Sequence, residues 1–273
     1  MSISDHLRFD GGVWLPIANE TREVSYPEMG NSDFFLIGDG SYWFQHRNAV
    51  ILDTFLRFSK PRWVLDIGGG NGVVSSNLQK NGFSVVVLEP GAEGAGNARA
   101  RGIQNVINAS FNEVYLRPGR VPAIGLFDVV EHIDDDLGFL IQINACLESK
   151  GRVYLTVPAY QFLWSDADLS AGHYRRYNRT SLCKLLGRAD FSIDYTTYFF
   201  SPLVLPLLLF RKLHSLIGQK NKSPLSAKRE HGVNGGFSVA CLKVVLGFER
   251  FLINNLGRLP FGTSLLVVAS KKE

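Results

Sequence analysis

The amino-acid sequence predicts an α/β protein with a doubly wound, mostly parallel β-sheet, and two observations predict this fold. Short apolar runs recur along the chain, separated by segments whose apolar residues have helical spacing. The first run after the N-terminal helical segment leads into a glycine-rich turn, and another helical segment begins directly after it. Buried strands that alternate with helices form parallel sheets covered on both faces, and such sheets bind ligands at the edge where the strands end.

The expected elements are an N-terminal helix followed by alternating strands and helices. Strands are predicted at residues 63–67, 84–88, 105–107, 123–127, 152–157, 191–197 and 263–270, the last of them antiparallel. Helices are predicted at residues 42–58, 72–81, 92–101, 131–149 and 179–188. Residues 1–40 are predicted to be irregular, because glycines and prolines interrupt any period there.

The chain divides into four parts on this basis. Residues 1–60 form an N-terminal segment with a cap helix, and residues 61–197 form the core. Residues 198–260 form a helical insertion, and residues 261–273 supply the final strand of the core sheet. The charge is uneven: residues 211–273 carry 11 Lys and Arg against 3 Asp and Glu. This basic region predicts an anionic surface or substrate nearby, or else a solvated basic face without a partner.

Composition and termini exclude several classes of protein. An apolar fraction of 45% and a charged fraction of 20% are typical of a packed chain and exclude disorder, collagen and a coiled coil. The three cysteines lie far apart and form no metal-ligand pattern, which suits a reducing compartment. The first residues lack a basic region followed by an apolar stretch. We therefore expect no signal peptide and a cytoplasmic location.

The insertion begins with an apolar stretch, residues 195–210, that carries no charge. It is shorter than the ~20 residues of a membrane-spanning helix, and Pro202 and Pro206 interrupt it. Residues 198–218 are therefore expected to lie peripherally on the inner face of the membrane, with basic residues on anionic headgroups. A second amphipathic helix beneath them has an apolar face of Phe237, Cys241, Val244, Val245 and Phe248. The alternative is that both helices only cap the sheet or pack against a second subunit in a homodimer.

The segment VLDIGGGNG, residues 64–72, is the most informative in the chain. Asp66 ends an apolar run, and Gly68, Gly70 and Gly72 follow at alternate positions. Glycines there let the backbone approach a ligand, and the first N–H groups of the next helix are directed at that ligand. This arrangement predicts a site for a small anionic or polar cofactor at the end of the strand.

The following strand supports the same site, because it ends at Glu89. A carboxylate at that place can accept hydrogen bonds from both hydroxyls of a ribose. A nicotinamide dehydrogenase would require a third glycine where this chain has Val73, so the motif does not fit that class. The predicted cofactor contacts at these two strand ends are Asp66, Gly68, Gly69, Gly70, Asn71, Glu89 and Pro90.

The motif resembles the first motif of class I S-adenosylmethionine-dependent methyltransferases. The chain is similar to the bacterial type-11 and type-23 branch of that family, which is often associated with glycosyltransferases. The matching segments are SYWFQHRNAVIL, VLEPGAEGAGNARARG, GLFDVVEHIDDD, VYLTVPAYQFLWSDADLSAGHYRRYNRTSL and PFGTSLLVVASKK. They cover residues 41–272, with the insertion poorly matched. The resemblance implies a Rossmann-like fold, S-adenosylmethionine as cofactor and S-adenosylhomocysteine as product.

The resemblance also implies roles for single residues. Ser110 and Phe111, after the third strand, would pack on the adenine, while Phe127 and Asp128 would lie beside the methionine moiety. Asp66 would orient the ammonium group of the cofactor. Many relatives have a carboxylate where this chain has Ser110, so the contact to the adenine amino group is expected to be weaker here.

Methyl transfer from a sulfonium is an in-line displacement, which leaves proton removal from the acceptor as the main chemical task of the protein. Asp128, Glu131 and His132 follow the fourth strand and can face the cofactor edge. They resemble a segment of quinone O-methyltransferases that has been linked to a divalent metal. The alternative is that Glu131 and His132 pack at a helix start, where acidic residues are favoured. We expect the latter, with no metal.

The loop after the fifth strand supplies the remaining candidates. His173 is the first candidate for the general base, followed by His132 and Asp128. Basic and aromatic side chains of this loop are predicted to bind the acceptor by ion pairs and ring stacking: Trp164, Arg175, Arg176 and Tyr177. Arg47, from the N-terminal helical segment, is a further candidate for binding the acceptor. Arg47 could equally bind the carboxylate of the cofactor. The alternative is a loop latched by ion pairs between Asp168 and the arginines.

Three functions remain open: methyl transfer to oxygen of a small-molecule, sugar or lipid-linked acceptor, methylation or binding of nucleic acid, and cofactor binding without catalysis. Base methyltransferases usually have an Asn/Asp-Pro-Pro-aromatic motif where this chain reads Asp128-Val-Val-Glu131. Its basic residues are also not interleaved with aromatic ones. His173 and the arginines argue against a scaffold without catalysis. We therefore expect O-methylation and no nucleic-acid partner.

Overall fold

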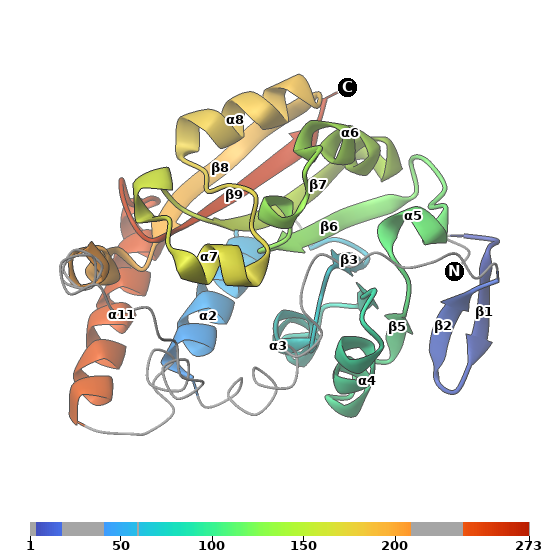
Figure 1. Cartoon of the computed structure of the whole chain (residues 1–273), viewed down its shortest axis with the longest axis horizontal. Helices are drawn as coiled ribbons and strands as arrows, with labels where there is room; N and C mark the ends of the chain where they lie inside the picture. The colour runs from blue at the N-terminus through green and yellow to red at the C-terminus, as the bar shows by residue number, and fades with distance from the viewer. Residues whose placement is uncertain (1–3, 18–40, 59, 209–236, 273) are drawn as a thin grey trace.

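The computed structural model describes residues 4–17, 41–58, 60–208 and 237–272, which fold around one nine-stranded sheet (Figure 1). The strands are β1 (Leu7–Asp10), β2 (Val13–Pro16), β3 (Val64–Ile67), β4 (Val85–Leu88), β5 (Asn105–Ile107), β6 (Val121–Phe127), β7 (Leu147–Pro158), β8 (Phe191–Phe199) and β9 (Ser264–Lys271). Their order in the sheet is β1-β2-β5-β4-β3-β6-β7-β9-β8. Strands β5, β4, β3, β6 and β7 run parallel, whereas β9 is antiparallel to β7 and β8. The predicted fold and its antiparallel last strand are confirmed.

Helices cover both faces of this sheet (Figure 1). The main ones are α2 (Tyr42–Leu56), α3 (Val73–Lys80), α4 (Ala92–Ala100), α5 (Phe111–Val114), α6 (Asp136–Cys146), α7 (Asp166–Ala171), α8 (Arg179–Arg188) and α11 (Phe237–Leu256). Helices α6 and α8 pack with Leu65 on one face, and α2, α3 and α11 pack with Val64 on the other. Successive strand residues point to opposite faces, so both sides of the central strands are apolar.

Residues 7–16 differ from the sequence prediction, which made residues 1–40 irregular. They form the hairpin β1–β2, and the connection contains Gly11 and Gly12, both with positive φ. Two glycines between short apolar strands are a hairpin signal as well as a helix breaker. Strand β2 extends the parallel sheet by pairing Trp14 with Ile107 of β5.

The predicted helix at residues 131–149 was also wrong in its extent. It is divided into a short 3₁₀ turn, η1 (Val130–His132), and helix α6, and strand β7 begins at Leu147. Asp135 caps α6 by accepting a hydrogen bond from the N–H of Gly138 at 2.9 Å. The aspartates that precede α6 thus start a new helix, and they separate the Glu131-His132 pair from it.

The described part of the insertion packs α11 against α2. Leu246 and Ile253 are buried there, and the Glu249 carboxylate lies 2.6 Å from the Nε2 atom of His46 on α2. The Glu249 carboxylate also accepts hydrogen bonds from the N–H groups of Phe200 and Ser201. The face of α11 that contains Leu246, Glu249 and Ile253 therefore covers the sheet.

The apolar face predicted for α11 points the other way. Val244 and Phe248 are 73% and 61% exposed. Residues 209–218 of the predicted interfacial helix lie outside the described residues. None of the helices in the described ranges is long and apolar enough to cross a bilayer. Membrane contact through residues 198–218 stays a prediction.

Candidate functional site

The glycine-rich turn between β3 and α3 forms one half of the site. Gly68 donates its N–H to the carbonyl of Leu88, at 2.8 Å, which joins the turn to the end of β4. Gly72 has a φ of 71° and begins α3. A Cβ on Gly72 would lie 2.9 Å from the Cβ of Ala98 on α4, so only glycine fits this close approach. The turn therefore brings α3 and α4 together at the carboxyl edge of the sheet.

Glu89 follows β4 and holds this turn from the opposite side. One carboxylate oxygen accepts the N–H of Gly70 and the other accepts the N–H of Gly91, both at 2.8 Å. Burial raises the pKa of Glu89, although these two hydrogen bonds lower it. Asn108, at the end of β5, donates to the carbonyls of Glu89 and Pro90. Each Glu89 oxygen keeps a second lone pair, which can accept a ribose hydroxyl.

Asp66 lies beneath the turn and is 1% exposed. Its Oδ2 accepts a hydrogen bond from the Ser75 hydroxyl at 2.5 Å, while its Oδ1 has no partner among the described residues. Burial raises the pKa of Asp66 to about 7. Its predicted role toward the ammonium group of the cofactor stays a prediction. The structure brings Asp66 and Glu89 to neighbouring strand ends, as their sequence positions indicated.

The other predicted cofactor contacts lie at the ends of the neighbouring strands. Ser110 is the N-cap of α5 and forms a capping box with Glu113. Phe111 packs edge-on against Phe139, with ring centroids 5.4 Å apart. Asn71 accepts a hydrogen bond from the Asn97 side chain at 2.9 Å. Phe127 is buried, and Gly69 and Pro90 belong to the two turns described above.

Asp128 comes directly after β6 and is held by three contacts. Its backbone has a φ of 59°, and its N–H donates to the carbonyl of Thr156 on β7. Its Oδ1 accepts the Thr156 hydroxyl at 3.0 Å, and its Oδ2 lies 2.6 Å from a guanidinium nitrogen of Arg47. Both oxygens of Asp128 are therefore engaged. Arg47 thus ties α2 to the end of β6, and its predicted contact with the acceptor or the cofactor stays a prediction.

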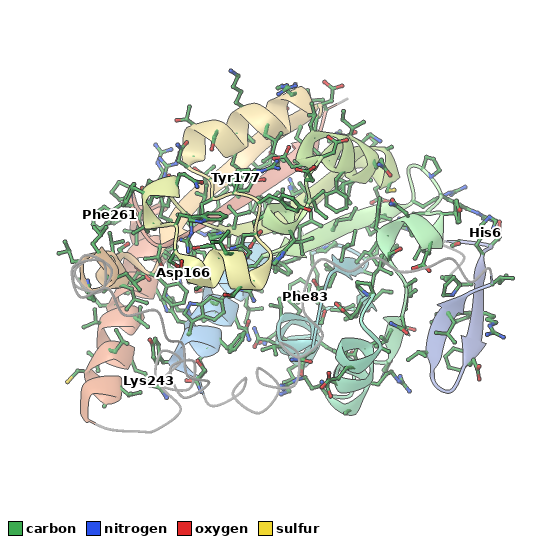
Figure 2. All side chains as sticks on the ribbon, viewed as in Figure 1. His6, Phe83, Asp166, Tyr177, Lys243 and Phe261 are labelled. Atoms are coloured by element: carbon green, nitrogen blue, oxygen red, sulfur yellow. The ribbon has the colours of Figure 1, made fainter. Side chains whose placement is uncertain are left out.

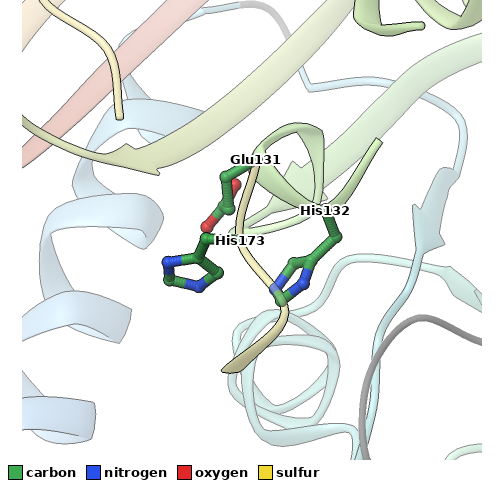
Figure 3. A group of neighbouring side chains, drawn as sticks. All are labelled: Glu131, His132 and His173. Atoms are coloured by element: carbon green, nitrogen blue, oxygen red, sulfur yellow. The ribbon is translucent and has the colours of Figure 1, made fainter. Parts of the chain in front are cut away.

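Glu131, His132 and His173 form a separate group beside Asp128 (Figure 3). Glu131 and His132 come from η1, and His173 comes from the loop that follows α7. The ring centroids of the two histidines are 4.7 Å apart, and the angle between the ring planes is 78°. One nitrogen or oxygen atom of each residue lies within 4.8 Å of those of the other two. Three such side chains can hold a metal ion, and either histidine can take a proton.

The electrostatics of this group follow from its burial. Burial and the neighbouring Asp128 carboxylate raise the pKa of Glu131 well above its usual range. Neither carboxylate oxygen of Glu131 has a hydrogen-bond partner in another described residue. Burial and the nearby His173 lower the pKa of His132 to about 4, so that its imidazole is neutral at physiological pH.

Helix α7, which the sequence analysis did not include, positions His173. Asp168 of α7 is 1% exposed, and its Oδ1 lies 2.9 Å from Nδ1 of His173. Its two oxygens also accept hydrogen bonds from Arg176 at 2.7 and 3.1 Å. Burial alone would raise the pKa of Asp168, but the contacts with His173 and Arg176 outweigh it and hold this pKa well below its usual range. The pattern Ser165-x-x-Asp168, a capping box, was the available signal for this helix.

The loop arginines and Tyr177 are all bonded to carboxylates of the protein itself, and their predicted contacts with the acceptor stay predictions. Arg176 is bound to Asp168, and Arg175 pairs with Asp134 and Asp136. The latched loop, considered above as the alternative, therefore describes these arginines better than an anion clamp. Tyr177 is 4% exposed and donates its hydroxyl to Asp136 at 2.8 Å, so its ring belongs to the core (Figure 2).

The last predicted acceptor contact is Trp164. Trp164 is half-buried after the 3₁₀ turn η2 (Gln161–Leu163), and its stacking role stays a prediction. The aromatic residues at the start of α2 are packed: the Trp43 ring stacks on Phe200, with centroids 5.5 Å apart.

Comparisons by sequence match the chain to methyltransferases. The family model of a methyltransferase domain, type 23, matches residues 43–196. The chain is similar to a ubiquinone biosynthesis O-methyltransferase of Aeromonas salmonicida, with 23% identity over 99 residues that make up 34% of this chain and 42% of that protein. The chain spans less than half the length of the curated relatives that it matches.

Two solved structures have the same fold. An S-adenosylmethionine-dependent methyltransferase of Thermotoga maritima has a TM-score of 0.55 at 14% identity, covering 89% of this chain and 96% of that one. Phosphoethanolamine N-methyltransferase 2 of Haemonchus contortus, solved with S-adenosylmethionine, has a TM-score of 0.59 at 17% identity, covering 94% of this chain and 61% of that one. At these identities the likeness establishes the fold alone.

Proposed function

The chain belongs to the type-23 methyltransferase domain family and is an S-adenosylmethionine-dependent methyltransferase, and from this premise we propose that it methylates a hydroxyl oxygen of a small-molecule, sugar or lipid-linked acceptor. The observation that carries the proposal is the position of the Glu131, His132 and His173 group. It lies beside Asp128, directly after β6, at the same sheet edge as the Gly68–Gly72 turn. A cofactor bound at this turn would therefore bring its methyl group to the same edge as a proton acceptor.

A hydroxyl acceptor needs such a neighbour, because an alcohol or phenol becomes a good nucleophile for the sulfonium methyl only as its proton leaves. His173 is the first residue to consider. Its Nδ1 faces the Asp168 carboxylate at 2.9 Å, which fixes the ring and leaves Nε2 for the acceptor proton. The arrangement resembles other sites in which a carboxylate orients a histidine by one nitrogen so that the other can act.

The charge of the site favours an acceptor that is neutral near the reacting atom. Arg175 and Arg176, the basic residues of this loop, are already paired with carboxylates. Asp128 and Glu131 add carboxyl groups at the same edge. A phosphate or carboxylate next to the reacting oxygen would therefore find neither of these two arginines free to pair with it. The name of the curated relative, an O-methyltransferase, supports oxygen as the methylated atom.

The test is transfer of a tritiated methyl group from S-adenosylmethionine to a panel of defined acceptors. The panel contains a simple catechol, a methyl glycoside, a polyprenyl-linked sugar, a primary amine and transfer RNA. We expect labelled product with a hydroxyl acceptor, and mass spectrometry and NMR of that product should locate the methyl group on oxygen. The Glu89→Ala variant serves as the cofactor-binding control. Label that enters only the amine or the RNA would contradict the proposal.

A further inference from the structure

The strongest unexplained feature of the molecule is the Glu131 carboxyl group. Its side chain is fully buried, and neither oxygen has a hydrogen-bond partner in another described residue. Leaving a buried polar group without a partner destabilises the folded state, and more so if the group is charged. Such a group usually faces a ligand, a water molecule or an ion. The two side chains next to it are both imidazoles, of His132 and His173 (Figure 3).

The distances within this group suit a small cation. Ligand atoms about 2.1 Å from a zinc ion lie roughly 3.4 Å apart in a tetrahedral site. The ligand atoms of Glu131, His132 and His173 already lie within 4.8 Å of one another, so small side-chain rotations suffice. We propose that Glu131, His132 and His173 bind one divalent cation of the zinc or manganese type. Two imidazoles and one carboxylate suit such ions, whereas magnesium and calcium prefer oxygen ligands throughout.

His173 rather than Asp128 is the third ligand. Asp128 precedes Glu131 by three residues and belongs to the ligand set considered from the sequence. However, its Oδ2 is 2.6 Å from Arg47 and its Oδ1 is 3.0 Å from the Thr156 hydroxyl. A cation would have to break the ion pair with Arg47 to use it. His173 requires no such exchange, because its Nε2 faces away from the Asp168 contact that its Nδ1 makes.

Asp168 completes the arrangement as a positioning residue. Histidine ligands of metals commonly bond a carboxylate through the nitrogen that does not touch the metal, which fixes the ring and raises its basicity. Asp168 has this relation to His173, and Arg176 holds Asp168 in turn. The N–H of Tyr174 donates to the carbonyl of Glu131 at 2.8 Å, so the loop that carries His173 is fastened to η1. The three ligands therefore come from two segments whose relative position is fixed.

This inference rests on the proposed function and deepens it. Three protein ligands leave at least one coordination position open, and a divalent cation lowers the pKa of a hydroxyl that it binds. His173 then contributes as a ligand rather than as the base itself. Substitution of His173 impairs methyl transfer in either case, so activity alone does not test the site. The test must measure the cation.

The experiment is calorimetric titration of metal-stripped, untagged full-length protein with zinc, manganese and magnesium chloride. We expect one zinc or manganese ion per chain and magnesium binding at least ~100-fold weaker. His173→Ala should weaken zinc binding by ~100-fold or more, and Asp168→Asn by ~10–100-fold, as expected for a ligand and for the group that orients it. Asp128→Asn should change zinc affinity by less than about threefold, since Asp128 is not a ligand in this arrangement. His6→Ala, at an exposed histidine away from the site, is the matched control.

Circular dichroism and S-adenosylmethionine affinity show that each variant is folded. Absence of stoichiometric zinc and manganese binding in the wild type overturns the proposal. It is also overturned if Asp128→Asn loses the ion while His173→Ala keeps it. Ion binding without methyl transfer to any hydroxyl acceptor contradicts the proposed function and leaves the cation site in place. Methyl transfer to a hydroxyl acceptor by protein that binds no cation supports the proposed function and overturns the cation site.

Discussion

Glu89 and Glu131 are two buried carboxyl groups at the same edge of one sheet, and they differ in what surrounds them. Glu89 is 6% exposed, and each oxygen accepts a backbone N–H at 2.8 Å. Glu131 is fully buried, and neither oxygen is bonded to another described residue. Both oxygens of Glu89 are thus hydrogen-bonded within the protein, whereas both oxygens of Glu131 still lack a partner among the described residues. On the proposed assignment of Glu89 to the cofactor half of the site and of Glu131 to the acceptor half, the first half is preorganised by its own backbone and the second is completed by what it binds.

The difference has a structural cause. Glu89 follows β4 and lies between two turns, so peptide N–H groups point at its carboxylate from both sides. Glu131 lies in the short turn η1, where the N–H groups of His132 and Ile133 donate to nearby carbonyls of the same turn. Its neighbours are the imidazoles of His132 and His173. Backbone donors stabilise a fixed carboxylate, whereas imidazoles bind protons and metal ions. The two halves therefore respond differently to substitution.

The largest effect is expected in the acceptor half. His173→Ala should lower turnover by ~10²–10⁴ while S-adenosylmethionine affinity stays the same, because proton removal is affected and cofactor binding is not. The neighbouring Tyr174→Ala, at a side chain that is 52% exposed, is the matched control and should retain activity. Steady-state kinetics and calorimetry measure the two quantities. Unchanged turnover in His173→Ala would assign proton removal to another group, with His132 next.

The second effect concerns the cofactor half. Glu89→Ala removes charge-assisted hydrogen bonds worth ~1.5–3 kcal/mol, so calorimetry should show S-adenosylmethionine binding that is weaker by more than about tenfold. Glu93→Ala, at an exposed carboxylate in the first turn of α4, should bind the cofactor as the wild type does. Equal affinity in a folded Glu89→Ala protein would remove Glu89 from the ribose site.

The third prediction compares the two carboxyl groups by the free energy of unfolding. Glu89→Met leaves the N–H groups of Gly70 and Gly91 without their acceptor and should cost ~2–3 kcal/mol. Glu131→Met removes a group that has no such donors and should leave the stability of the metal-stripped protein unchanged or raise it. Urea denaturation of both variants measures the difference. A larger loss in Glu131→Met than in Glu89→Met would reverse the comparison.

The sequence predicted the positions of the glycine-rich turn and of the strand ends around it well, because their signals are local. The run that ends at Asp66, the turn glycines and the strand that ends at Glu89 each depend on a few consecutive residues. Strand order and the parallel pairing of β3 with β4 then follow from general rules for such sheets. The hairpin at residues 7–16 was missed because two glycines were taken only as breakers of periodicity.

The acceptor half was harder because its contacts are made between distant segments. Asp128 meets Arg47 of α2, and His173 meets Glu131, 42 positions earlier in the chain. No spacing rule shows that Arg176 is bound to Asp168 rather than free to bind an acceptor. The outward apolar face of α11 has the same origin: periodicity shows that two faces exist, but tertiary packing decides that Leu246 and Glu249 face the core.

The smallest effect is expected for Asp66, whose surroundings are intermediate between those of Glu89 and those of Glu131. One oxygen accepts the Ser75 hydroxyl, and the other has no partner among the described residues. Burial raises the pKa of Asp66 from its ordinary value of 3.8 to about 7, so the folded state binds the proton of this carboxyl group more tightly than the unfolded chain does. The contribution of this carboxyl group to stability is thus fully present below a pH of about 3.8 and is lost as the pH rises through about 7.

Asp66→Asn stays neutral at every pH and can keep the hydrogen bond from Ser75. Thermal melts of the cofactor-free proteins should therefore show the melting temperature of the wild type falling by a few degrees relative to Asp66→Asn between pH 5 and 8, at roughly 2–4 °C per kcal/mol for a chain of this size. Parallel pH profiles for the two proteins would mean that Asp66 is already ionised in the folded state and has a partner comparable to those of Glu89.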